Sequence, residues 1–270
     1  MTDFMRICQT NLPLMPWMRP RGLSLPGLQP VEDADRVIVD DAFAAQMAYR
    51  EHLIEERRKV VYQALPSAEH HATAVLEEVT DLLRRRTDYQ CAPSSIRRPD
   101  GVEVDLTKAP PLVVLGCLIQ EDVAILEKVG DEHRLTAGLL CFPAHWRLSE
   151  KLGRSLFGVH DPVADYDAGL NRRVERILNM IRPGQPLMRA NALIYTNPDL
   201  HQPVAEAVTK DIEADQPRYV RVERQTLARL KRTGAIVFSI HTYLMPLSVL
   251  PRPAYKRLAA TRPRLAPTEG

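Results

Sequence analysis

Closely spaced cysteine pairs are missing from this chain of 270 residues. Its four cysteines are Cys8, Cys91, Cys117 and Cys141, and no two of them form a C-x-x-C pair. A zinc site or an iron–sulfur cluster held by cysteines normally needs thiolates that are close together, so the spacing argues against both. The dispersed cysteines also suggest no disulfide framework, which fits a reducing compartment.

Long apolar runs and a strong charge imbalance are absent as well. No apolar stretch approaches the roughly 20 residues that span a bilayer, and the N-terminus lacks the pattern of a secretory signal. With 36 basic and 34 acidic residues, the net charge of +2 gives no footprint for nucleic acid. Neither G-x-G-x-x-G nor G-x-x-x-x-G-K-[ST] occurs, so nucleotide binding through those loops is unsupported. We therefore expect a cytoplasmic globular protein without a membrane or nucleic-acid partner.

The first 40 residues are rich in proline. Because proline removes a backbone donor and restricts the residue before it, residues 1–40 are predicted to form an extended arm. Three large apolar side chains could pin this arm to the body of the protein: Leu14, Trp17 and Leu28.

Apolar periodicity predicts the elements that follow. Helices are expected over residues 41–64, from an N-cap at Ser67 to about residue 86, over 168–181, and briefly after Pro251, with a loop over 88–110. Strands are expected over residues 112–119, 123–128 and 135–142 as an antiparallel meander, and over 187–195, 218–226 and 235–243. Five or six antiparallel strands with helices before and between them indicate an α+β fold. We expect one domain over residues 41–260 and a loose tail over 261–270.

Histidine is the residue type best suited to bind a metal here. The eight histidines include no H-E-x-x-H motif, and His70 and His71 are adjacent on a predicted helix, where neighbours point to different faces. His160 lies in the run Gly158-Val159-His160-Asp161-Pro162-Val163, between two rigid elements. A histidine on such a loop suits metal ligation, although spacing alone fits an ordinary surface or capping histidine better.

Several short motifs together resemble those of one family. They are residues 141–153 (CFPAHWRLSEKLG), 159–163 (VHDPV), 120–122 (QED), 189–191 (RAN), 221–227 (RVERQTL), 234–238 (GAIVF), Thr242-Tyr243, Val39-Asp40-Asp41 and Arg50. In this combination the chain resembles the haem-dependent oxidative N-demethylase family over roughly residues 20–250. It departs from the family pattern at Ala192, where an aromatic residue would follow the asparagine, and at His145, where small residues are usual.

The resemblance implies a PAS-like sheet that holds haem b, with one histidine of the protein on the iron; on the VHDPV motif, this would be His160. It further implies that oxygen and two electrons convert a small secondary amine, such as dimethylamine, to a primary amine and formaldehyde. The electrons would come from separate flavin and iron–sulfur partner subunits of the reductase or ferredoxin type.

Polar residues near these motifs are candidates for binding the substrate and the cofactor. A protonated amine needs a carboxylate or other acceptors, and alternate residues of a strand share one face. The candidates for catalysis are Glu223, Gln225, Glu121 and Asp122. The cations that could hold haem propionates are Arg189, Arg221 and Lys151. For each acidic candidate and its neighbours, salt bridging at the edge of the sheet is the ordinary alternative.

Two other functions fit the same sequence. A PAS-like sheet could sense haem or another ligand without turnover, because a fold does not dictate a function. The departures at His145 and Ala192 also allow a structural or interaction protein that has lost the cofactor. The iron ligand could instead be His145, His201 or His241, and the oligomeric state is left open.

Overall fold

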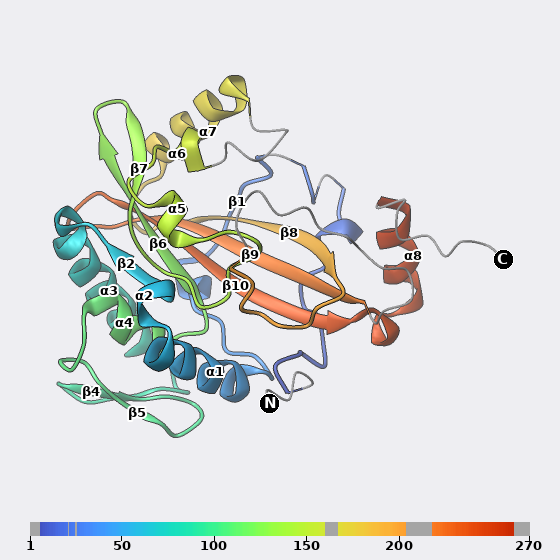
Figure 1. Ribbon diagram of the computed structural model, residues 1–270, viewed down its shortest axis with the longest axis horizontal. Coiled ribbons are helices and arrows are strands. Elements are labelled where there is room, and N and C mark those ends of the chain that lie inside the picture. The colour runs from blue at the N-terminus through green and yellow to red at the C-terminus, as the bar shows by residue number, and fades with distance from the viewer. Residues whose placement is uncertain (1–5, 21, 25, 160–166, 204–217, 262–270) are drawn as a thin grey trace.

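A seven-stranded antiparallel sheet forms the centre of the protein. The computed structural model describes residues 6–20, 22–24, 26–159, 167–203 and 218–261. Within these residues, the strand order is β1-β8-β9-β10-β6-β7-β2 (Figure 1). The bounds are β1 Gln29–Pro30, β2 Tyr62–Ala64, β6 Asp122–Val129, β7 Glu132–Leu139, β8 Leu187–Tyr195, β9 Tyr219–Arg229 and β10 Ile236–Pro246. The fold is therefore α+β, as predicted.

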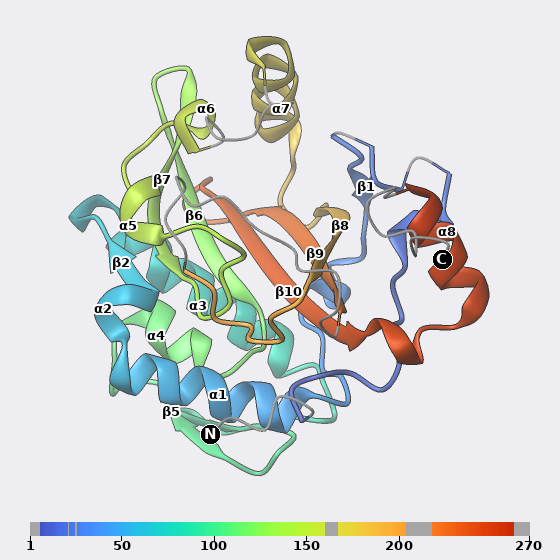
Figure 2. The ribbon, with the colours of Figure 1, turned by 45° about the vertical axis from the view of Figure 1, so that its right-hand side comes forward.

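One face of the sheet is closed by apolar packing at both of its ends. Helices α1 (Phe43–Glu56), α3 (Glu69–Leu83) and α4 (Pro111–Gly116) cover one end, where Val123, Ile125 and Leu139 join their core. At the other end, helix α8 (Arg252–Thr261) lies beside the sheet (Figure 2). There, Trp17 and α8 pack in one cluster with Val222 and Met245.

The opposite face is apolar only near the β6–β7 hairpin. There, side chains such as Leu126 and Leu227 pack with helices α5 (Leu148–Lys151), α6 (Leu156–Val159) and α7 (Ala168–Met180). The rest of this face, on β8 and β9, carries polar side chains. We call it the polar face.

The prediction of a strand over residues 112–119 was wrong, because this segment contains α4. An apolar run of this length fits a buried strand or a buried helix equally well. Pro111 lies at the start of α4, where its missing N–H costs nothing, and Leu112 to Gly116 are all buried. The three-strand meander is accordingly reduced to the β6–β7 hairpin.

The loop prediction for residues 88–110 was also wrong in part. This segment contains a small antiparallel sheet of β3 (Gln90–Cys91), β4 (Ser95–Arg97) and β5 (Glu103–Asp105). The predicted first helix ends earlier, since α1 is followed by a short α2 (Arg58–Val61) and then β2. Ser67 does not cap α3; it lies in a 3-10 turn and its hydroxyl donates to Glu127.

The proline-rich arm lies along the body of the protein and contains short 3-10 turns and the strand β1. Trp17 is 2% exposed, and its ring N–H donates to the carbonyl of Ala254 in α8 at 3.0 Å. Leu14 is buried in the same cluster, while Leu28 packs on the other side of the sheet. Among the described residues, no helix has the length and apolarity needed to cross a membrane.

Candidate functional site

The polar face holds a connected group of side chains from β8 and β9. Glu223 lies opposite Asn191 across the strand pair, and Gln225 lies opposite Arg189. The Glu223 carboxylate accepts hydrogen bonds from Asn191 at 3.1 Å and from Gln225 at 3.2 Å. Gln225 in turn accepts from Arg189 at 3.0 Å. Strand alternation thus brings together four of the residues singled out from the sequence.

Arg221 anchors the edge of this group to neighbouring loops. Its guanidinium donates to the carbonyls of Leu200, at 3.1 Å, and Phe142, at 2.5 Å, and its Nε lies 3.4 Å from Glu223. The side chain is 1% exposed. Its donors are therefore largely used inside the protein, where they fix the loops after β7 and β8 to the sheet.

Oδ1 of Asn191 and Nε of Arg189 are among the atoms of the polar face that are buried without a hydrogen-bond partner in the described part of the chain. Burial lowers the pKa of Arg189, while the nearby Glu223 raises it. A buried acceptor or donor without a partner is costly, so both atoms are suited to meet a ligand that pairs with them.

His145 lies at the rim of this face in a strained backbone conformation. Its φ is 61°, and among the described residues no other non-glycine has a positive φ. The ring stacks on Tyr195 with centroids 5.1 Å apart, and Tyr195 lies beneath the guanidinium of Arg221. The departure of the sequence at His145 therefore places an imidazole against the residues that border Glu223.

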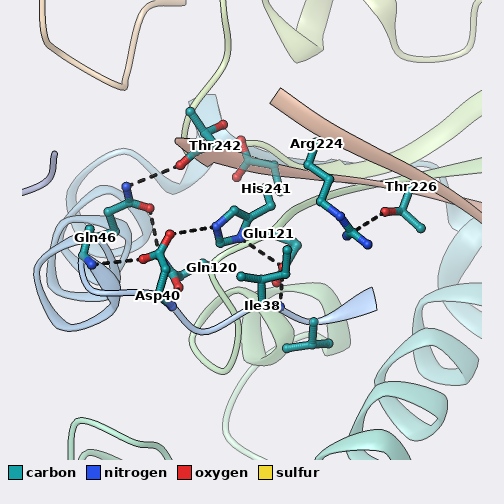
Figure 3. A network of polar contacts seen from close by, with 12 residues as sticks. Ile38, Asp40, Gln46, Gln120, Glu121, Arg224, Thr226, His241 and Thr242 are labelled. Carbon is teal, nitrogen blue, oxygen red and sulfur yellow. Dashed lines mark hydrogen bonds and ion pairs between the residues drawn. The ribbon is translucent and has the colours of Figure 1, made fainter. Parts of the chain in front are cut away.

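A second polar group lies within the opposite, packed face of the sheet (Figure 3). His241 of β10 is fully buried, and its two ring nitrogens lie 3.0 Å from Asp40 and 3.1 Å from Glu121. Glu121 also accepts from the backbone N–H of Ile38 at 2.9 Å, and Asp40 accepts from Gln120 at 3.0 Å. This group fastens the end of the proline-rich arm to the central sheet.

The charges of this group stabilise one another. Burial by itself lowers the pKa of His241, but hydrogen bonds and charge attraction from Asp40 and Glu121 outweigh it and raise the pKa to about 9. Burial acts to raise the pKa of Asp40, but His241 and the amide of Gln120 shift it below its usual value. His241 is therefore a cation between two carboxylates, with no free ring nitrogen for iron.

Asp122 belongs to a separate buried ion pair. Its carboxylate lies 2.6 Å from Arg50 and accepts from the backbone N–H groups of Cys141 and Phe142, each at 2.8 Å. Arg50 also donates to the carbonyls of Gly116 and of residue 121. Asp122 and Glu121 thus hold the architecture together, and their carboxylates are engaged by Arg50, His241 and backbone N–H groups.

Lys151 is also engaged within the protein. It is buried at the end of α5, and its ammonium donates to the carbonyl of Val159. His160, the predicted iron ligand, lies outside the described residues, so its role stays a prediction.

His201 differs from His241 in its protonation state. Its Nδ1 lies 2.8 Å from the carbonyl of Cys141, which can only accept, so Nδ1 carries the proton. Burial lowers the pKa of the ring, and this effect outweighs the hydrogen bond to Cys141, which raises it, so the imidazole is neutral. Nε2 then has a lone pair, and it has no partner within the described part of the chain. His201 is therefore the alternative iron ligand that the geometry permits.

Sequence reasoning missed His241, Asp40 and Arg50 as members of buried ionic groups. Both Asp40 and Arg50 occurred in motifs that carried the family resemblance. Their contacts join residues separated by 201 positions in one case and 72 in the other, and no local pattern reveals such pairs. Among the residues described, no cluster of three histidine, cysteine or acidic side chains could hold a metal ion.

A known family matches most of the chain. The profile of the family described as "Haem-dependent oxidative N-demethylase, alpha subunit-like" matches residues 27–264. The matched region contains the whole main sheet, both ionic groups and the whole polar face.

Proposed function

Because the chain belongs to the haem-dependent oxidative N-demethylase, alpha subunit-like family, we propose that it is the haem-binding subunit of an enzyme that demethylates a small secondary amine. Dimethylamine, oxygen, two electrons and two protons would give methylamine, formaldehyde and water. The observation that carries this proposal is the buried carboxylate of Glu223 beside the unpartnered Oδ1 of Asn191.

These two acceptors suit a protonated amine. An ammonium group has only N–H donors, and its hydrogen bonds to a carboxylate are stronger than those between neutral groups. Glu223 is already held by Asn191 and Gln225, so its position is fixed before the substrate arrives. Binding of the amine nitrogen here would orient the methyl group of the substrate. The Glu223 carboxylate would balance the positive charge of the amine in a site with little water.

The polar face also fits the haem that the family name implies. Half-buried Leu193 lies on this face beside the polar group and offers apolar contact, and Phe238 of β10 lies on the same side of the sheet, against the apolar cluster that includes Leu227. Arg189 has a buried, unpartnered Nε that could donate to a propionate. When bound, the haem would supply oxygen activation. We propose a PAS-like arrangement in which His160 would bind the haem iron.

Four of the candidates from the sequence have three roles in this proposal. Glu223 and Gln225 would bind and position the amine, and Arg189 would hold a propionate. Arg221 would act by fixing Glu223, since its donors are used internally. Electrons would come from separate flavin and iron–sulfur subunits.

Absorption spectra and oxygen uptake test this proposal. The protein purified from cells supplied with haem should show a Soret band, and His160→Ala should shift or abolish it while His201→Ala leaves it unchanged. The reverse result would assign the iron to His201. Absence of a Soret band in the unaltered protein would refute haem binding.

Turnover separates an enzyme from a sensor. With an electron donor, oxygen uptake should depend on dimethylamine and release formaldehyde in equal amount. A stable haem spectrum without amine-dependent uptake for any small secondary amine would favour the non-catalytic, ligand-sensing alternative.

A further inference from the structure

A cavity of about 360 Å³ lies apart from the polar group of β8 and β9. One side of the cavity is formed by α2 and β2, and the other side is formed by the loop that leads into α5. Its apolar lining includes Trp146, Leu140 and Pro143. This volume falls within the usual range for small-molecule sites, roughly 300–1,000 Å³.

Three cationic side chains line this cavity: Arg57, Lys59 and Arg147. Within the described part of the chain, Arg57 and Lys59 make no side-chain hydrogen bond or ion pair that offsets their charge. Arg147 donates through Nε to the carbonyl of Pro203 at 2.8 Å, and its Nη1 lies 3.9 Å from Glu150. The lining therefore carries more positive than negative charge, and an anion would balance it.

His201 adds a different requirement to the same cavity. It lines the cavity and is 6% exposed. Since Nδ1 donates to the carbonyl of Cys141 at 2.8 Å, Nε2 is an acceptor, and it has no partner among the described residues. A fully ionised anion offers only acceptors and would not pair with this atom. An occupant that also carries an O–H or N–H donor therefore fits the cavity better.

From the three cations, the acceptor on His201 and the apolar wall, we propose that this cavity binds a small hydroxylated phosphate ester. The phosphate would lie against Arg57, Lys59 and Arg147. A phosphate dianion is a better partner for three cations than a singly charged carboxylate is. A hydroxyl would donate to Nε2 of His201, and the carbon chain would lie against Trp146. None of the polar side chains of the amine site lines this cavity, and the proposal requires that His201 is not the iron ligand.

Calorimetric titration of the purified protein, with its haem, tests this proposal through matched ligands. Glycerol 3-phosphate should bind saturably, whereas propyl phosphate, which lacks the hydroxyls, should bind at least tenfold more weakly. Glycerol, which lacks the phosphate, should show no binding. Equal affinity for the two phosphates would overturn the role of His201, and no saturable binding of either would overturn the site.

Variants locate the binding within the cavity. Arg57→Gln and Arg147→Gln should each weaken glycerol 3-phosphate at least tenfold, and His201→Leu should make the two phosphates bind alike. Arg84→Gln, on the exposed surface of α3, serves as the matched control and should change nothing. The unfolding temperature of each variant shows that it is folded.

Two outcomes would reassign the cavity. If Arg57→Gln and Arg147→Gln displace the Soret band and leave phosphate affinity unchanged, the cations serve haem propionates and the proposal fails. If malate, a hydroxylated carboxylate, binds and neither phosphate ester binds, the proposed ligand class is wrong. Neither outcome depends on whether the protein demethylates amines.

Discussion

His241 and Asp40 lie 3.0 Å apart inside the protein, although 201 positions separate them in the chain. One belongs to the central strand β10 and the other to the end of the proline-rich arm. Together with Glu121, they form a buried ionic group in which the imidazole is the cation. The stability of the protein should therefore respond to pH in a way that these residues determine.

At alkaline pH, we expect stability to fall as His241 loses its proton. Its pKa is about 9 when folded and about 6.5 when unfolded. The contribution, roughly 3 kcal/mol in the free energy of unfolding, is complete below pH 6.5 and disappears as pH rises through 9. Urea unfolding of the wild type and of His241→Gln, between pH 6 and 10, measures the difference. The matched control is His52→Gln on the exposed side of α1. If the unfolding free energy of His241→Gln still falls between pH 6 and 10 as in the wild type, His241 is not its cause.

At acidic pH, Asp40 should have the opposite effect. Its pKa is lower in the folded protein than in the unfolded chain, so the stabilisation it gives is present above about pH 4 and is lost as pH falls through the folded value. Asp40→Asn should flatten the acid limb of the stability profile. Asp35→Asn, an exposed position on the same arm, should leave that limb as it is.

Removing Arg50 should destabilise the protein more than removing a surface arginine. Arg50→Met leaves Asp122 as an unpaired buried charge, which costs about 3–5 kcal/mol. Arg84→Met breaks an exposed pair with Asp81 and should cost less than about 1 kcal/mol. Urea denaturation of both variants makes the comparison. Equal losses would mean that the Arg50–Asp122 pair is not buried as described.

The cysteines should be slow to react in the folded protein. Burial raises the pKa of Cys8 to about 11 and that of Cys141 to about 12. A thiol is reactive as the thiolate, so a disulfide reagent at pH 8 should label these two only after unfolding. In a Cys91→Ser, Cys117→Ser double variant, any rapid labelling of the native protein would contradict this expectation.

Loss of the acceptors on the polar face should affect substrate binding more than folding. Asn191→Ala and Glu223→Gln should each raise the KM for dimethylamine by roughly tenfold or more, because a hydrogen bond to a charged group contributes about 1.5–3 kcal/mol. Steady-state oxygen uptake gives KM and kcat, and the Soret band reports the haem. Gln185→Ala, in the exposed turn before β8, is the control. An unchanged KM in Glu223→Gln would remove this carboxylate from the amine site.

Amphipathic elements were predictable from local pattern. The strand expected over residues 187–195 has these bounds in the structure, and the helix expected over 168–181 is α7, Ala168–Met180. Each has one apolar face in the core and one polar face, so the period of its apolar residues is visible in the sequence. The segment at 112–119 is buried on all sides, and its apolar run therefore contained no period that could distinguish helix from strand.

The sequence by itself determined the α+β class, the pinned arm and the family, because alternating apolar residues, prolines and short motifs are local properties. It also placed Glu223 and Gln225 on one face, since strand alternation requires no knowledge of the partner strand. Only the tertiary structure decided which charges meet. The pairs His241–Asp40 and Arg50–Asp122 depend on how distant segments pack, and burial then sets their protonation and their energy.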